Sequence, residues 1–276
     1  MPKNKKKSKK GKKRSYIVLI FLLIIAGAFF FHEELGKEGT KGKTPAVIKP
    51  KKENIPSGKI KLPKVAIVID DMGESKEAAK ELLDINARFT CAILPHETHT
   101  EWIAGECSRL GHEVIAHIPM EAKTPHKLGK GGLYTWMTEA EILDNINDDI
   151  SAVPHVAGIS NHMGSAFTED SRAMRAVMPV LKKRGLFFLD SLTTSGSAGN
   201  NLAKTMGVKS LRRDVFLDDK DSPAYIRTQW ENLLKIAGKR GFAIALGHPK
   251  ENTIKFLKEV LPKNQVEVVP LSELIQ

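Results

Sequence analysis

Residues 65–71 read VAIVIDD, an apolar run that ends in two adjacent carboxylates, Asp70 and Asp71. The same pattern, an apolar run followed by an acid, an amide or an imidazole, recurs along the chain: EVIA before His117, HVAGIS before Asn161 and His162, LFFL before Asp190, and FAIALG before His248. Short apolar runs of this kind are typical of buried parallel strands. The C-terminal ends of such strands share one face of the fold, where active sites are built. We therefore expect these side chains to lie together.

Helical patterns separate most of the strand candidates. Thr138 to Glu141 forms a capping box, and Ser222-Pro223 is an N-cap followed by proline at the first helical position. A glycine closes each of three helices just before the next strand, at Gly111, Gly185 and Gly241. The strand candidates are 65–69, 89–94, 113–118, 156–160, 186–189, 214–217, 242–246 and 266–269. Seven or eight β/α units in residues 64–276 predict an α/β fold, an irregular (β/α)7–8 barrel.

The formal charge of +11 is concentrated at the N-terminus. Residues 1–14 hold nine Lys and Arg and no acid, whereas the chain from Lys64 onward carries a formal charge of −2. No basic stripe with interleaved aromatic residues follows Lys64, so we expect no nucleic-acid partner for the folded part.

A membrane anchor explains the basic tail. Residues 16–31, YIVLIFLLIIAGAFFF, carry no charge, and the segment 15–32 is close to the ~20 residues that span a bilayer. Basic residues before it place the N-terminus in the cytoplasm. We expect one transmembrane helix in the cytoplasmic membrane, with the C-terminal domain outside the cytoplasm. The alternative is a signal peptide cleaved near Ala26-Gly27-Ala28, which would release a secreted domain.

Residues 33–63 are rich in Gly, Lys, Pro and Glu and predict a flexible linker. Cys91 and Cys107 are the only cysteines. A bridge between them is open outside the cytoplasm, but Cys91 lies in an apolar strand and is typical of a buried thiol.

The strand-end residues predict a divalent metal site with an acid/base pair. An Asp and two His around an open position are a common arrangement for a catalytic zinc or a similar ion, which suggests Asp70 or Asp71 with His117 and His162. His248, between Gly247 and Pro249, is placed to protonate a leaving group. Asp70 and Asp71 can instead be helix N-caps, because a helix begins near Glu74. His96 and His99 are rival ligands, although Pro95 puts them in a loop.

Six ordered motifs carry a resemblance to a known family. They are AIVIDDMG, TCAILP, HIPME, SNHMGS, FFLDSLT and ALGHP, and they span nearly all of residues 65–270. This set resembles the divergent branch of the polysaccharide deacetylases, which have the NodB-homology fold, a distorted β/α barrel. The resemblance implies that Asp70 is the general base, Asp71 and His117 are metal ligands, and His248 is the catalytic acid.

The chain departs from the usual family pattern at two places. A second histidine normally stands four residues after the first, where this chain has Glu121. His162 is our replacement for that ligand, and Glu121 either binds the metal or holds a ligand in place. The usual arginine-proline segment is also absent, and Asn161 to Ser165 occupies its position. We expect Asn161, Ser165 and Asp190 to contact substrate or support the ligands.

The sequence thus predicts an exported, membrane-tethered, zinc-dependent hydrolase that removes N-acetyl groups from a cell-envelope glycan. A catalytically silent glycan-binding or scaffold domain, and another metal-dependent amidase, remain as alternatives because fold alone does not fix function. Trp136 and Tyr134 lie in a Gly-rich loop after the third strand. They form either a sugar-stacking platform or part of the core.

Overall fold

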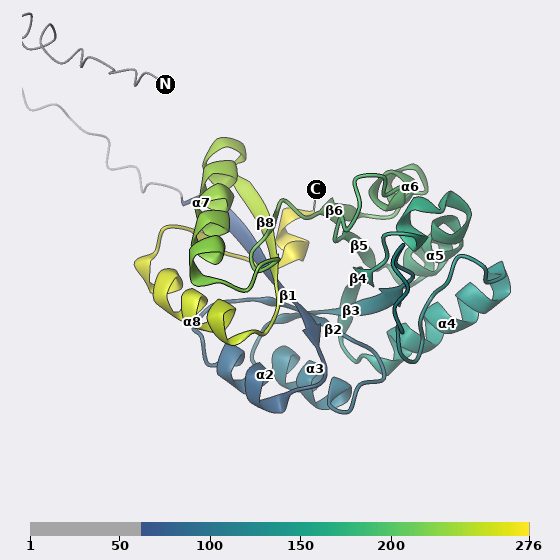
Figure 1. Cartoon of the computed structure of the whole chain (residues 1–276), viewed down its shortest axis with the longest axis horizontal. Coiled ribbons are helices and arrows are strands. Elements are labelled where there is room, and N and C mark those ends of the chain that lie inside the picture. Colours follow the sequence, from purple (N-terminus) through teal and green to yellow (C-terminus); the bar gives the residue numbers. More distant parts are fainter. Residues whose placement is uncertain (1–61, 276) are drawn as a thin grey trace, which may run out of the picture. The chain divides into compact units, whose positions relative to one another are not determined.

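The computed structural model describes residues 62–275, which fold around one parallel β-sheet (Figure 1). The order of the strands across it is β6-β5-β4-β3-β2-β1-β8-β7, and β9 pairs with the start of β1. The strands are β1 (Lys64–Met72), β2 (Thr90–Ile93), β3 (Glu113–Met120), β4 (Val156–Met163), β5 (Phe187–Asp190), β6 (Ser210–Arg212), β7 (Val215–Phe216), β8 (Phe242–Gly247) and β9 (Glu267–Val268).

The sheet is a half-barrel. The predicted parallel strands and their alternation with helices are confirmed, but closure into a barrel is wrong, because β6 and β7 are the two ends of the strand path. The connection between them, Arg213 and Asp214, is only two residues long. Parallel neighbours need a crossover of a dozen or more residues, so β6 pairs with β5 and β7 with β8 instead.

Helices cover the outside of the curved sheet, as Figure 1 shows. They are α2 (Lys76–Leu83), α3 (Thr100–Arg109), α4 (Glu139–Ala152), α5 (Ser171–Arg184), α6 (Gly199–Thr205), α7 (Pro223–Arg240) and α8 (Glu251–Val260), with short 3-10 turns η2 (Phe167–Glu169), η3 (Leu261–Lys263) and η4 (Leu271–Leu274). The predicted capping box of Thr138 and Glu141 begins α4, and Ser222 caps α7. Gly185 and Gly241 end α5 and α7 in the left-handed conformation, as expected.

Both faces of the sheet are buried, which explains why β1 is a continuous apolar run rather than an alternating one. Val65, Ile67 and Ile69 pack in the cluster beneath the helices. Ala66 and Val68 face inward and pack with the C-terminal segment, including Leu271. Because β9 pairs with the start of β1, this segment fills the interior at the N-terminal ends of the strands. The C-terminal ends remain available for a site.

The predicted tail (1–14), anchor (15–32) and most of the linker (33–63) lie outside the described residues. Within residues 62–275, no helix combines the length and apolarity needed to cross a bilayer. Cys91 and Cys107 are both buried and both free thiols, so the bridge left open by the sequence does not form here.

Candidate active site

The end of β1 is bent by a β-bulge that places both carboxylates. Ile69 pairs with Cys91 and Met72 with Ile93, so β1 has one extra residue within this stretch. Asp71 adopts φ +55°, a left-handed conformation that Asp tolerates better than most residues. A bulge redirects neighbouring side chains. Asp70 and Asp71 belong to this strand end rather than to a helix cap, since Ser75 is the N-cap of α2.

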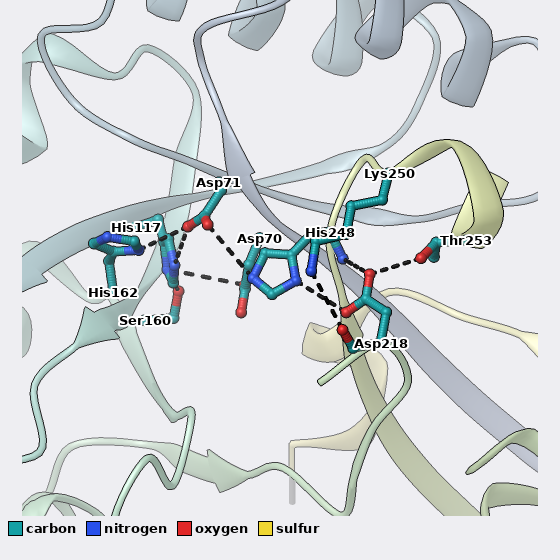
Figure 2. A network of polar contacts seen from close by, with 9 residues as sticks. All are labelled: Asp70, Asp71, His117, Ser160, His162, Asp218, His248, Lys250 and Thr253. Atoms are coloured by element: carbon teal, nitrogen blue, oxygen red, sulfur yellow. Dashed lines mark hydrogen bonds and ion pairs between the residues drawn. The ribbon is translucent and has the colours of Figure 1, made fainter. Parts of the chain in front are cut away.

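Asp71 lies between two histidines from adjacent strands. Its Oδ1 is 3.2 Å from His117 Nε2 on β3 and 2.7 Å from His162 Nδ1 on β4. Figure 2 shows these two imidazoles on one side of the Asp71 carboxylate and His248 on the other. The two rings meet edge to face, with centroids 5.1 Å apart. We call these three residues the Asp-His-His cluster.

The donor atoms of the Asp-His-His cluster fit a divalent metal ion. One oxygen and two ring nitrogens lie within 4.8 Å of one another. Asp71 Oδ1 is buried yet has no hydrogen-bond partner among the described residues, despite its closeness to both rings. Such an orphaned oxygen is expected where a ligand completes the site. An O,N,N set of this kind suits zinc or a similar ion.

The protonation states of Asp71 and His117 also favour a cation. Burial lowers the pKa of His117 to about 4, although Asp71 opposes this, so the imidazole is neutral at pH 7. Its Nδ1 lies 2.7 Å from Ser160 Oγ, which fixes the ring with Nε2 directed at Asp71. Burial alone would raise the pKa of Asp71, but His117 and His162 outweigh it and the pKa falls well below its ordinary value. An ionised carboxylate and a neutral imidazole are competent ligands.

Asp70 is a second carboxyl with the opposite tendency. It is almost fully buried, and its Oδ1, 3.9 Å from His117 Nδ1, has no hydrogen-bond partner in the part of the chain described. Burial, followed by the charges of Asp71 and Asp218, raises its pKa well above the ordinary range. Two adjacent carboxyls with pKa values displaced in opposite directions suit different chemical roles.

His248 follows β8 and is oriented by Asp218, a residue that the sequence analysis missed. His248 Nδ1 lies 2.9 Å from Asp218 Oδ1, and its Nε2 lies 3.4 Å from Asp71 Oδ2. Asp218 is fully buried and accepts hydrogen bonds from the His248 backbone N–H and from Thr253 Oγ1 (Figure 2). Burial would raise the pKa of Asp218, but these contacts outweigh it and keep the pKa low. The signal was present, because VFLDD repeats the pattern of an apolar run ending in an acid.

A cleft of about 430 Å³ joins these groups, and its lining includes Asp70, Asp71, His117, His162, His248 and Arg213. Arg213 was also missed. Its guanidinium donates to the carbonyls of Ser191 and Leu192, and its charge lowers the pKa of Asp70 against the effect of burial. The sequence near β6 gave no sign that Arg213 would reach the cleft, because its position depends on the pairing of two very short strands.

The remaining predicted residues lie around the cleft or away from it. Asn161 lines the cleft and accepts a hydrogen bond from the Ser191 N–H. Ser165 Oγ accepts from the Lys123 N–H, and Asp190 accepts from Leu192, Ser197 and Asn200, so both hold loops.

Among the described residues, Glu121 is not part of the Asp-His-His cluster. Its Oε2 accepts hydrogen bonds from Thr135 N and Oγ1. Of the rival histidines, His96 contacts Asp149 at 3.0 Å, and His99 stands at the start of α3. The structure therefore joins Asp71 with His117 and His162 and leaves Glu121, His96 and His99 outside.

Comparisons with known proteins agree with the motifs. The chain is 36% identical over 198 residues to the uncharacterized protein YibQ of Escherichia coli K12, covering 72% of this chain and 62% of YibQ. It is also 36% identical over 195 residues to an uncharacterized protein of Haemophilus influenzae, covering 71% and 70%. The matched region thus spans less than two thirds of YibQ.

The fold also has a relative among solved structures. The uncharacterized protein ATU2773 of Agrobacterium tumefaciens C58 superposes with a TM-score of 0.74 at 24% identity, over 79% of this chain and 92% of that one. A family model described as divergent polysaccharide deacetylase matches residues 67–275, nearly the whole described region. The resemblance read from six motifs is therefore confirmed, and the chain belongs to the divergent polysaccharide deacetylase family.

Proposed function

We propose that this protein is a metal-dependent hydrolase that removes N-acetyl groups from a cell-envelope glycan. The observation that supports this best is the arrangement around Asp71. The Asp-His-His cluster, a buried carboxyl with a raised pKa and a carboxylate-oriented histidine all face one cleft. Amide hydrolysis needs a base for water, a stabiliser for the oxyanion and an acid for the amine, and these groups supply the required residue types.

Asp71, His117 and His162 would hold the metal ion, with zinc our first expectation. When bound, a divalent cation supplies Lewis acidity at the acetamide carbonyl and makes water a better nucleophile. Asp70, in its ionised form, accepts the proton of the water that attacks the carbonyl carbon. His248 donates a proton to the nitrogen as the C–N bond breaks, which leaves acetate and a free amine.

The flanking residues keep these two groups in position. Asp218 is ionised and accepts a hydrogen bond from His248 Nδ1, which fixes the orientation of the ring that serves as the acid. Arg213 donates to two backbone carbonyls and faces the same cleft as Asp70. Its positive charge favours the ionised form of Asp70, the form able to accept a proton.

The assay is release of acetate from N-acetylglucosamine oligomers by the full-length chain. We expect activity that chelator abolishes, that added zinc or manganese restores, and that is lost in Asp71→Asn and His162→Asn. His155→Asn is the matched control, since His155 is exposed and lies outside the cleft. Activity that persists both in chelator and in Asp71→Asn would disprove the metal mechanism.

We further propose that the protein is tethered to the cytoplasmic membrane through residues 15–32, with the cleft outside the cytoplasm. The support is the uncharged run 16–31 behind nine basic residues. Cell fractionation tests it: the chain should sediment with membranes and should leave them when residues 15–32 are deleted. N-terminal sequencing of the mature chain separates an anchor from a cleaved signal peptide.

A further inference from the structure

Tyr134 and Trp136 form an aromatic pair in the loop that follows β3. Their rings stack with centroids 5.5 Å apart and planes 22° apart. Trp136 is 69% exposed, which excludes the core role left open by the sequence. The other exposed large apolar side chains within residues 62–275, Leu62 and Leu110, are less exposed, at 36% and 46%.

The backbone carrying the pair is fixed on one side to β3. The Leu133 N–H donates to the Pro119 carbonyl at 2.8 Å, and the Glu121 N–H donates to the Leu133 carbonyl at 2.9 Å. The Glu121 carboxylate then accepts from Thr135 N at 2.7 Å and from Thr135 Oγ1 at 2.6 Å. Glu121, which occupies the position of the family's second histidine, thus holds the aromatic loop in place through hydrogen bonds.

Arg172 at the start of α5 fixes the other side of the loop. Its Nη1 donates to the Met137 carbonyl at 3.0 Å, and its Nη2 donates to the Thr135 carbonyl. The carbonyls on both sides of Trp136 are therefore occupied. A loop whose backbone is already held in place loses little conformational entropy when a ligand binds to it.

The pair lies on the same face as the reaction cleft. Glu121 is four residues beyond His117, a distance of roughly 13 Å at the rise of a β-strand. The Glu121 carbonyl also accepts from the N–H groups of Ala166 and Phe167, just after the strand that carries His162. The loop is therefore joined to the C-terminal ends of both ligand-bearing strands, beyond the lining of the cleft itself.

The surroundings favour a carbohydrate over a protein. Protein interfaces are built on contiguous apolar patches and are depleted in lysine. Here a single exposed ring lies in a loop with three exposed lysines, Lys123, Lys127 and Lys130. A sugar ring presents a flat C–H face with hydroxyls at its edge, which matches one aromatic plane with polar neighbours.

We propose that Tyr134 and Trp136 form a sugar-stacking subsite outside the reaction cleft, which binds a second part of the glycan chain held in the cleft. This deepens the proposed function and rests on it for the identity of the ligand. One sugar occupies the cleft at Asp71 while a neighbouring part of the same chain stacks on Trp136.

The test is calorimetric titration of the full-length chain with N-acetylglucosamine and with its pentamer. We expect the pentamer to bind at least about tenfold tighter, a typical size of effect for a tryptophan anchor. In Trp136→Ala the ratio of pentamer to monomer affinity should fall toward one, and Trp136→Phe should keep most of it. Leu110→Ala, another exposed apolar residue, is the control and should retain the ratio.

Equal affinity for monomer and pentamer, or pentamer binding by Trp136→Ala that matches the unmodified chain, would overturn the subsite. Loss of a protein complex in Trp136→Ala with pentamer binding intact would overturn it too, in favour of a protein partner. Acetate release on the same samples separates the two proposals. If the unmodified chain binds the pentamer through Trp136 but releases no acetate, the proposed deacetylase activity is refuted. If Trp136→Ala binds the pentamer and releases acetate as well as the unmodified chain does, only the subsite is refuted.

Discussion

Asp218 illustrates how much of this site depends on single buried contacts. It bonds the His248 ring, the His248 backbone and Thr253, and its ionised form is the one that orients the imidazole. Removing its charge leaves the ring free to adopt the wrong tautomer or orientation. The cluster at Asp71 does not depend on this contact.

We therefore expect Asp218→Asn to lower kcat for acetate release by roughly 10²-fold or more, the range for loss of an oriented acid. Metal content should be unchanged, because Asp218 is not part of the Asp-His-His cluster. Steady-state kinetics and elemental analysis measure both. Asp221→Asn, an exposed neighbour that bonds Asn252, is the control. Full activity in Asp218→Asn would contradict the assigned role.

A second residue-scale feature lies away from the cleft. Asp149 on α4 is fully buried, and burial, with the charge of Asp148, raises its pKa to about 8. Its Oδ1 is 3.0 Å from His96 Nε2, and burial together with Lys130 lowers the pKa of His96 from 6.5. In the folded protein, the Asp149–His96 pair therefore retains one proton, on one partner or the other, up to a pH of about 8. The unfolded chain loses that proton above the ordinary histidine value of 6.5.

Because the folded state holds more protons in this window, the free energy of unfolding should fall as pH rises from 6.5 to about 8. The slope is at most ~1.4 kcal/mol per pH unit, or roughly 1–2 kcal/mol in all. Urea unfolding at both pH values should show this fall, and Asp149→Asn should remove most of it. Asp144→Asn, exposed on the same helix, should not. An unchanged pH dependence in Asp149→Asn would refute the assignment.

At the scale of elements, α4 depends on its first turn. Thr138 accepts from the Glu141 N–H, and Glu141 accepts from the Thr138 N–H, so two otherwise orphaned donors are satisfied. Ile142 and Ile146 on its buried side belong to the core cluster, and the helix contacts β3, the strand that carries His117.

Thr138→Ala should lower the free energy of unfolding by about 1 kcal/mol, the typical loss for an N-cap. In a domain of this size that corresponds to a fall in Tm of roughly 2–4 °C. Thermal unfolding measures it, with exposed Thr124→Ala as control. A Tm equal to that of the unmodified chain would show that the box does not stabilise α4.

The elements also show how far sequence reasoning reached. The ends of β1, β3, β4 and β8 were predictable, because apolar runs that end in Asp or His mark buried parallel strands. β6 was not, since three residues, Ser210–Arg212, give no periodic signal. Arg213 was missed for the same reason. The half-barrel depends on long-range pairing at the sheet edges, which local patterns do not encode.

At the scale of the whole molecule, the fold leaves one face for chemistry. The C-terminal segment fills the interior at the N-terminal strand ends, and the cleft lies at the opposite ends. His162 joins Asp71 and His117 there, while Glu121 fastens the aromatic loop. The difference from the usual family motif thus has a geometric counterpart, because the residue that joins Asp71 and His117 is His162 on β4 and not Glu121 beyond β3.

The most direct test is the metal content of the full-length chain after reconstitution with zinc or manganese, by elemental analysis. The account predicts one ion per chain, lost in His162→Asn and retained in both Glu121→Gln and His155→Asn. No bound metal in any preparation, or a metal retained in His162→Asn and lost in Glu121→Gln, would contradict the Asp-His-His cluster as the metal site.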